Sequence, residues 1–560
     1  MKWRRTIVTY LIISPLIYIL IGYVFYPLFS TFVASVMHDG AFSLEKYRQF
    51  FDLKNFSNLQ ALFTSIYISV LSVIFSGIVG VLLAFLLSRY EFPGRKILSS
   101  LAVLPMALPP LVGVYAFVFL FSESGIIPRA LKELFGLAAV PFKLRGIPGV
   151  LVVHTFTMYV YFYLMASTAF SALDPSLEEA AYNLGANRFT VWRKVILPML
   201  TPALVAASLL VFMVSMASYT APLIFGVERT LTMQIYISRT NGDLAMAATQ
   251  STLLSMVSIS FLIFMRWYQS RRIYRSVSKG VVTQRTELKN PVVRYAAGIT
   301  AIILVFILLL PILTLVLVSF SVDYAWTVQI LPPKYTLANY AKLFSNPRTW
   351  EPIKNSLVMS GIATAANIIF GIAAAYAIVR MYFKGKNLMD ILIMLPWALP
   401  GTVIGINLIT AFNRPTVFTA NNILVGTFWI MPLAYFVRHI PLVYRSTSAA
   451  LMQLDPNIEE AALNLGATWG YTFRRVVLPL ISPGIISGAL LAFVQGIGEF
   501  VASILLYTPS SRPISVAIYE HMYRFEFGTA SAYGVLQVLL IIIVLLVTGQ
   551  FSEKASQTAI

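Results

Sequence analysis

The sequence predicts an all-α integral membrane protein with twelve transmembrane helices arranged as two similar halves. Hydrophobic residues make up 58% of the 560 residues, charged residues only 11%, and the mean hydropathy is +0.79. Soluble domains carry about a quarter charged residues, so too little polar surface is present to cover a water-soluble globule. Long apolar segments recur along the chain, and motifs of the first half return in the second. These observations identify the membrane as the solvent of the protein.

A transmembrane helix needs about 20 mostly apolar residues. Each half of the chain contains six segments of this kind. The first of them is too long for a signal-peptide core and is predicted to remain as a membrane helix. The predicted spans are 7–32, 62–88, 97–121, 148–171, 199–225 and 244–265, then 295–320, 355–379, 388–412, 422–444, 480–507 and 528–550.

Lysine and arginine determine the predicted orientation. The net charge of +19 would suggest nucleic acid as the partner of a soluble protein, but here the basic residues gather in every second gap between spans. Those gaps are predicted to be cytoplasmic, as are both termini, and no nucleic-acid partner is expected. The most basic stretch, 266–294, is predicted to link a first domain, 1–265, to a second, 295–560. Binding of anionic phospholipid is a secondary role for it.

The chain offers little chemistry of its own. It has no cysteine, which excludes disulfides and thiolate catalysis, and its four histidines have no metal-ligand spacing. It also lacks the glycine-rich phosphate loop of ATPases. No catalytic residue, bound metal or cofactor is expected in this chain, which is predicted not to be an enzyme.

The two halves repeat each other in sequence. "SRYEFPGRK" (88–96) corresponds to "VRMYFKGKN" (379–387), and "LPMALPPLVG" (104–113) to "LPWALPGTVIG" (395–405). Between 173–198 and 454–479, 15 of 26 positions are identical. Two six-span copies insert with the same topology, which predicts a pseudo-twofold axis along the membrane normal.

The repeated segment follows the fourth span of each half, on the predicted cytoplasmic side. Asp174 and Asp455 are expected to cap a short helix whose first residue is proline. Gly185 and Gly466 are expected to end it in a left-handed conformation. A second short helix would then run to Pro198 or Pro479, so the pattern predicts a helix–turn–helix lying along the membrane surface. Packing on the protein's own bundle is the alternative to docking of a partner.

The pattern E-E-A-A, three residues, G-A and a terminal L-P resembles the EAA loop of ABC importer permease subunits. The fused layout of two permease domains is most similar to iron(III)-uptake permeases of the binding-protein-dependent class, with the type I fold. The resemblance implies that two copies of a cytoplasmic ATP-binding subunit, which hold ATP and Mg, dock on the loops. It also implies an extracytoplasmic solute-binding protein and a prokaryotic inner membrane. The implied coupling residues are Glu178, Glu179, Ala180, Ala181, Leu184, Gly185 and Ala186, and Glu459, Glu460, Ala461, Ala462, Leu465, Gly466 and Ala467.

Polar residues within the predicted spans are candidates for a translocation pathway. A carboxylate in lipid is costly and usually faces the bundle interior, so Glu499 is the first candidate, with a structural hydrogen bond as its alternative role. Weaker candidates, for which packing is the alternative, are Gln495, Asn407, Ser218 and Tyr219. His154 is predicted to be a hydrogen-bonded interior histidine. "YEHMYRFEF" (519–527) is predicted to be a solvated outside loop, with contact between its acids and His521 and a substrate-loaded binding protein as the alternative.

Two classes of transporter therefore fit the sequence. The first is the permease of an ATP-driven importer, with iron(III) as the leading substrate and thiamine, polyamines or aminophosphonates as alternatives. The second is an ion-coupled secondary transporter, which also suits two parallel six-span halves but gives the paired loops no purpose.

Overall fold

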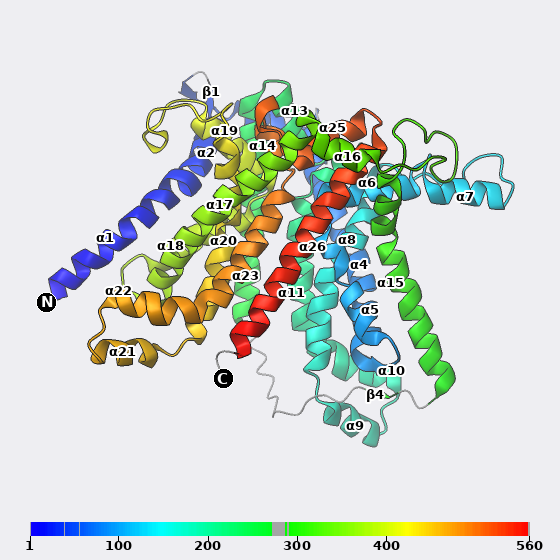
Figure 1. Cartoon of the computed structure of the whole chain (residues 1–560), viewed down its shortest axis with the longest axis horizontal. Coiled ribbons are helices and arrows are strands. Elements are labelled where there is room, and N and C mark those ends of the chain that lie inside the picture. The colour runs from blue at the N-terminus through cyan, green and yellow to red at the C-terminus, as the bar shows by residue number, and fades with distance from the viewer. Residues whose placement is uncertain (1, 39, 55, 272–285, 288–289, 558–560) are drawn as a thin grey trace. The chain divides into compact units, whose positions relative to one another are not determined.

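The structure is a computed structural model that describes residues 2–38, 40–54, 56–271, 286–287 and 290–557. The described chain is almost entirely helical (Figure 1). Its only strands in these ranges are two-residue pairs: β1 (Met37–His38) is antiparallel to β2 (Ala41–Phe42), and β3 (Tyr90–Glu91) is parallel to β4 (Thr286–Glu287). The predicted linker 266–294 lies largely outside the described residues.

The helices form two compact units. Residues 1–50, 235–255 and 336–560 make the first unit, and residues 51–234 and 256–335 make the second. The first unit contains α1 (Lys2–Leu20), α2 (Tyr26–Val36), α3 (Glu45–Phe50), α16 (Ala338–Ser345), α17 (Pro347–Arg380), α18 (Lys386–Ala398), α19 (Gly401–Phe412), α20 (Ile430–Gln453), α21 (Pro456–Asn464), α22 (Trp469–Thr472), α23 (Leu478–Ile497), α24 (Ser503–Leu506), α25 (Ile514–Tyr523) and α26 (Phe527–Gln557).

The second unit is built mainly from the first half of the sequence. It contains α4 (Ser57–Arg89), α5 (Arg95–Leu101), α6 (Pro110–Phe121), α7 (Ile126–Leu134), α8 (Gly146–Ser171), α9 (Pro175–Asn183), α10 (Arg188–Val191), α11 (Leu197–Met216), α12 (Thr220–Phe225) and α15 (Pro291–Ser319). Two helices, α13 (Leu231–Thr240) and α14 (Leu244–Arg271), have residues in both units.

The two halves exchange their first spans. The first span of the first half packs in the unit built mainly from the second half, and the first span of the second half packs in the unit built mainly from the first half. In the second unit, α15 packs on α4, α5 and α6, and Ala301, Val305 and Leu308 join the core around Leu83 and Phe92. In the first unit, α1 packs on α17 and α18, and α2 on α19. The contact units therefore differ from the sequence halves at these spans.

The third span of each half is broken at a proline. In the second half, α18 and α19 meet at an angle of 112°. Leu399 and Pro400 are extended between them, because the ring of a proline disfavours the helical conformation of the preceding residue. The first half breaks in the same way before Pro110. The predicted spans 97–121 and 388–412 are therefore each interrupted by a break.

The fifth spans also end earlier than predicted. α11 stops at Met216 and α23 at Ile497, and the short helices α12 and α24 follow after a break. Within the described residues, ten helices are long and apolar enough to cross a membrane, or up to eleven if the bent pair counts as one span. The predicted number of twelve is not reached, because α20, which carries Arg438 and Arg445, is not among them.

Candidate functional site

The repeated segments form the same capped helix in both units. The carboxylate of Asp174 accepts a hydrogen bond of 2.9 Å from the backbone of Ser176, and Asp455 does the same for Asn457. A cap of this kind satisfies a backbone N–H that the first helical turn leaves without a partner. The hydrogen bonds from Ser176 hold the pKa of Asp174 below its usual range. The predicted caps are confirmed.

Each capped helix ends at its glycine. Gly185 has a φ of +83° and Gly466 a φ of +89°, a conformation that costs glycine least because it has no Cβ. The N–H of Ala186 bonds to the carbonyl of Ala181, and that of Ala467 to the carbonyl of Ala462. These bonds belong to the Schellman motif, which closes a helix and reverses the chain. The predicted glycine stops are confirmed.

The second helix of each segment does not stop at the proline. α10 continues through a π-turn over Trp192–Ile196 into α11, and α22 through Phe473–Val477 into α23. In each case a proline lies just beyond the π-turn, and a proline can neither bond to nor pack closely against the carbonyl four residues back. The wider turn accommodates it. The prediction of a separate second helix was therefore wrong.

The two acids of each loop differ in their surroundings. Glu178 pairs through both oxygens with Arg89 at the end of α4, one bond being 2.7 Å from Nη2 to Oε2. Glu459 pairs with Arg380 at the end of α17, at 2.7 Å from Nε to Oε1. Both of these carboxylates are largely buried. The loop is thus tied to the second span in each unit.

The rest of each loop is presented to the surroundings. Glu179 and Glu460, the second acids, are exposed. Leu184 is 88% exposed and Leu465 is 89% exposed, which is unusual for leucines on well-ordered turns. The small residues that follow in the loop, with Tyr471 and Val476, line a surface hollow beside Leu465. The remaining coupling candidates alternate between exposed (Ala180, Ala461) and half-buried positions (Ala181, Ala186, Ala462, Ala467).

Sequence reasoning missed the two arginines. They occupy the same position in "SRYEFPGRK" and "VRMYFKGKN", so the repeat contained the signal. An arginine at the cytoplasmic end of a span was read only as an orientation marker, although a bidentate guanidinium is well suited to hold a carboxylate.

In the second unit, the break after α11 is held by neutral hydrogen bonds. His154 on α8 lies 2.8 Å from the hydroxyl of Ser72 through Nδ1 and 2.8 Å from that of Ser218 through Nε2. The ring is 2% exposed, and the prediction of a hydrogen-bonded interior histidine is confirmed. The neighbouring Tyr219 is also buried.

In the first unit, the break after α23 holds a charged pair. Glu499 is 6% exposed, and its Oε2 lies 2.7 Å from Nε of Arg438 on α20. Its other oxygen accepts a hydrogen bond from the N–H of Ala502. Gly401, the first residue of α19, allows the arginine to approach, since a Cβ there would lie 2.4 Å from Nη1. Two helices, α19 and α20, therefore meet the break at this ion pair.

The other pathway candidates are not gathered around this pair by any hydrogen bond of the described residues. Asn407 on α19 is 3% exposed, and its Oδ1 is buried without a hydrogen-bond partner. Gln495 lies on an exposed side of α23. No group of three or more histidine, aspartate or glutamate side chains within the described ranges could hold a metal ion.

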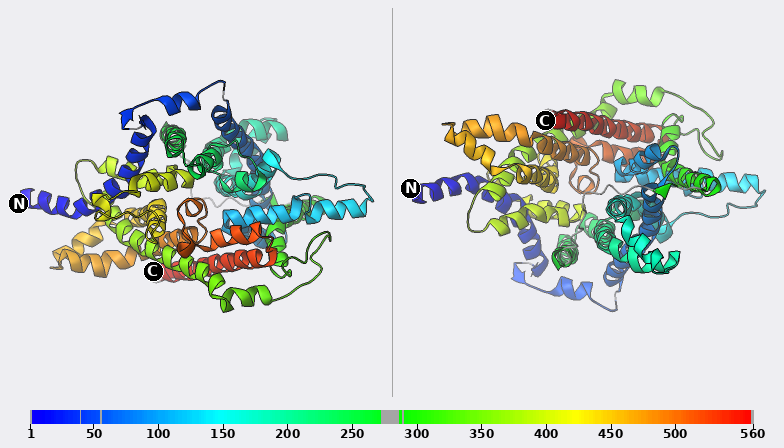
Figure 2. Two further views of the ribbon diagram at one scale, coloured as in Figure 1. Left: turned by 90° about the horizontal axis from the view of Figure 1, so that it is seen from above. Right: turned by 90° about the horizontal axis from the view of Figure 1, so that it is seen from below.

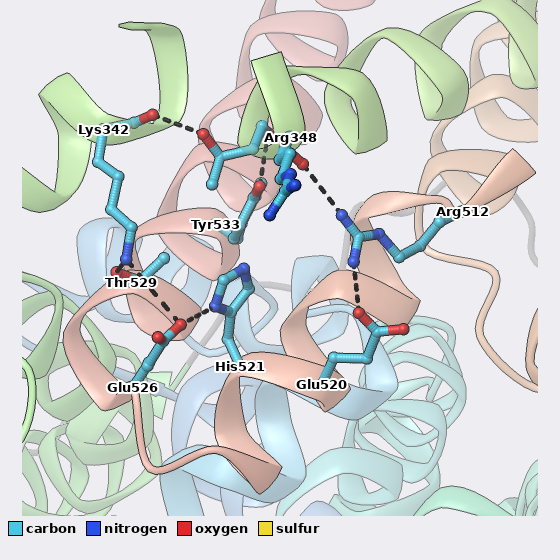
Figure 3. A network of polar contacts seen from close by, with 9 residues as sticks. Lys342, Arg348, Arg512, Glu520, His521, Glu526, Thr529 and Tyr533 are labelled. Atoms are coloured by element: carbon cyan, nitrogen blue, oxygen red, sulfur yellow. Dashed lines mark hydrogen bonds and ion pairs between the residues drawn. The ribbon is translucent and has the colours of Figure 1, made fainter. Parts of the chain in front are cut away.

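A polar network (Figure 3) fixes the end of the first unit that lies opposite the capped helix α21 (Figure 1). His521 on α25 bonds through Nδ1 to Glu526, and Nζ of Lys342 lies 3.9 Å from the same carboxylate. Arg512 pairs with Glu520 and donates to the backbone carbonyl of Arg348 at 3.0 Å. Burial lowers the pKa of His521, and Glu526 opposes that shift. The segment 519–527 is therefore an ordered helix end, and the prediction of a solvated loop was wrong.

The same family model matches both halves of the chain. Residues 76–274 and 367–557 match the binding-protein-dependent transport system inner membrane component. A probable ABC transporter permease protein, y4fN of Sinorhizobium fredii, is 30% identical over 82% of this chain and 81% of its own length. The ferric transport system permease protein FbpB of Actinobacillus pleuropneumoniae is 28% identical over 95% of this chain and 76% of its own.

A solved structure is also similar to part of the chain. A bacterial ABC transporter for import of the polysaccharide alginate aligns with 47% of this chain and 95% of its own, at 22% identity and a TM-score of 0.39. The family match covers more than half of the chain in two copies. The chain therefore belongs to the family of binding-protein-dependent transport system inner membrane components, and it carries two such components in one polypeptide.

Proposed function

We propose that the chain forms the membrane pathway of an ATP-driven importer and that its two repeated loops are the docking sites for two copies of a cytoplasmic ATP-binding subunit. The observation that carries this proposal is the identical construction of the loops. Each has a capped helix, a glycine stop, one acid bound to an arginine of the second span and a leucine almost fully exposed. Identical docking elements suit a partner present in two identical copies.

The anchored acids give the loops a way to transmit motion. Glu178 and Glu459 connect each loop to the second span, while the π-turns connect it to the fifth span without interruption. Closure of ATP-binding subunits beneath the loops would move both spans together. Substrate would be released by alternating access, after delivery by an extracytoplasmic binding protein. Both termini and the loops would then be cytoplasmic, in a prokaryotic inner membrane.

The exposed acids allow a direct test. We expect the double variant Glu179→Ala, Glu460→Ala to lose co-purification with the ATP-binding subunit and to lose uptake in proteoliposomes. Glu133→Ala removes an exposed acid of α7, away from the loops, and serves as the matched control. Intact binding and full uptake in the double variant would exclude the loops as the docking sites.

Iron(III) is the substrate that we propose. A relative that matches 95% of the chain, and so both halves, is named a ferric transport permease. A sulfate permease of Salmonella typhimurium matches only 35% of the chain, and a 2-aminoethylphosphonate permease only 48%. Uptake of radioactive iron with the cognate binding protein should be saturable and should require ATP. Uptake of thiamine, a polyamine or an aminophosphonate instead would replace iron without affecting the docking proposal.

A further inference from the structure

The connection between α6 and α8 is longer than its counterpart in the other half. It is closed by a hydrogen bond from Leu144 to the carbonyl of Phe121, and the counterpart by one from Leu424 to the carbonyl of Phe412. Between these closing residues lie 22 residues in the first half (122–143) and 11 in the second (413–423). The additional residues form α7 and the turn that follows it, which together are called the excursion (126–142).

This excursion is an ordered structure. Arg129 of α7 donates hydrogen bonds to the backbone carbonyls of Gln329, at 2.6 Å, and Thr327. The N–H of Leu137 returns to the carbonyl of Lys132, which closes the end of α7. At the base, Arg145 and Lys143 both pair with Glu123. The position of α7 is therefore fixed by contacts at its polar side and at its base.

The apolar side of the excursion has no protein covering. Leu134 is 76% exposed and Phe135 is 66% exposed, and Leu137 and Phe142 are exposed as well. In the counterpart connection, Phe418 is covered by the rings of Tyr18 and Tyr26, although Val417 is exposed there as well. An ordered apolar surface left open in water would be costly.

The excursion lies where a bilayer surface would be. It connects the ends of α6 and α8 that are opposite the loop at α9, and it extends sideways beyond α6 and α15 at the level where these helices end (Figures 1 and 2). The same unit exposes Ile302, Phe306 and Val316 along α15, an apolar side suited to contact with lipid.

We propose that the excursion, residues 126–142, is an interfacial membrane anchor. Its apolar side chains enter the bilayer surface on the side opposite the docking loops, and Lys132, Lys143 and Arg145 remain among the lipid headgroups. A short helix with apolar residues on one side and basic residues on the other binds a membrane in this orientation. The anchor would hold the third span of the first half at a fixed depth during transport.

The absence of cysteine from the sequence makes a direct test simple. Single variants Leu134→Cys and Phe135→Cys are labelled with a nitroxide in the full-length protein reconstituted in phosphatidylcholine–phosphatidylglycerol vesicles. Collision rates with oxygen, which dissolves in lipid, and with a water-soluble nickel chelate are then measured. Val316→Cys is the lipid-facing reference near the end of a span, and Glu133→Cys is the polar reference on α7 itself.

We expect labels at 134 and 135 to collide more with oxygen than with nickel, as the label at 316 does, and the label at 133 to show the reverse. Nickel collisions at 134 and 135 equal to those at 133 would overturn the proposal. So would labels that are water-exposed in vesicles and become shielded only when substrate-loaded binding protein is added, because the surface would then be a protein docking site.

Discussion

The two halves of the chain agree closely at their docking loops and differ at the breaks that follow the fifth span. At the loops, Arg89 and Arg380 each hold the equivalent acid, Arg89 through both nitrogens of its fork and Arg380 through Nε. At the breaks, Ser218 meets a neutral histidine, whereas Glu499, at the corresponding position, meets an arginine. The repeat is therefore preserved at the loops, where we propose that two identical partners dock. It is not preserved at the breaks in the interior of each unit.

The largest effect on stability is expected at the break after α23, which holds the Glu499–Arg438 pair. We expect Arg438→Leu to lower the stability of the protein by about 3 kcal/mol, because it leaves the Glu499 carboxylate buried without its partner. Thermal unfolding in detergent would measure the loss.

The double variant Arg438→Leu, Glu499→Gln makes the second break neutral like the first and should recover most of that stability. Uptake by the double variant then reports on the pathway directly. Full transport by the double variant would show that the charged pair has a structural role alone. If Arg438→Leu alone were as stable as the wild type, the ion pair would not contribute to stability as expected.

The docking loops should respond alike to loss of their arginines. Arg89→Ala and Arg380→Ala each break the ion pair with the anchored acid, which has two hydrogen bonds at Glu178 and one at Glu459. About 1.5–3 kcal/mol is typical for a charge-assisted hydrogen bond. Partial exposure of both pairs places the expected loss at the lower end of this range. ATPase activity stimulated by loaded binding protein should fall to the same extent in both variants. Unequal losses would mean that the two halves contribute differently to coupling.

The two glycine stops should also be equivalent. A Cβ added at either site meets no other atom within 4 Å, so the backbone conformation is the main resistance to a side chain there. We expect Gly185→Val and Gly466→Val each to cost about 1–2 kcal/mol through the left-handed conformation, and to weaken co-purification of the ATP-binding subunit. Gly470→Val, in α22 and with open space around it, is the control. Unchanged binding in both variants would mean that the turn tolerates another shape.

The smallest effect is expected at the histidine of the polar network. A lysine lies near the acid that precedes the last span of each half. In the first half Lys46 pairs with Asp243. In the second half Lys342 approaches Glu526, and His521 contacts the same acid. Because burial lowers the pKa of His521 in the folded protein, the unfolded chain binds a proton more readily, and stability falls as the pH drops below about 6.5.

Melting temperatures between pH 7.5 and 5 would measure this slope. His521→Gln should flatten this slope. Lys46→Met removes the lysine partner of Asp243, a pair without a histidine, and should leave the slope unchanged. A wild-type slope that survives the loss of His521 would assign the pH dependence to another group.

The sequence predicted the features that depend on local patterns. Asp174, Gly185 and their repeats were recognisable because caps and glycine stops act within a few residues. Interruptions of a helix by tertiary structure were less visible. The breaks after Met216 and Ile497 lie within long segments that are apolar on average, so each segment was read as one span. Arg438 could not be identified as the partner of Glu499, because the two are 61 positions apart and only packing of α20 against the break brings them together.

The exchange of first spans also constrains how the protein is made. The core around Leu83 and Phe92 is completed by α15, so it stays open to lipid until the ribosome has passed Ser319. Packing of α1 is delayed further, because its neighbours α17 and α18 are synthesised later than α15. Neither unit can close during synthesis of the first half. A chain cut into its two sequence repeats would yield two fragments that must find each other in the membrane before either is complete.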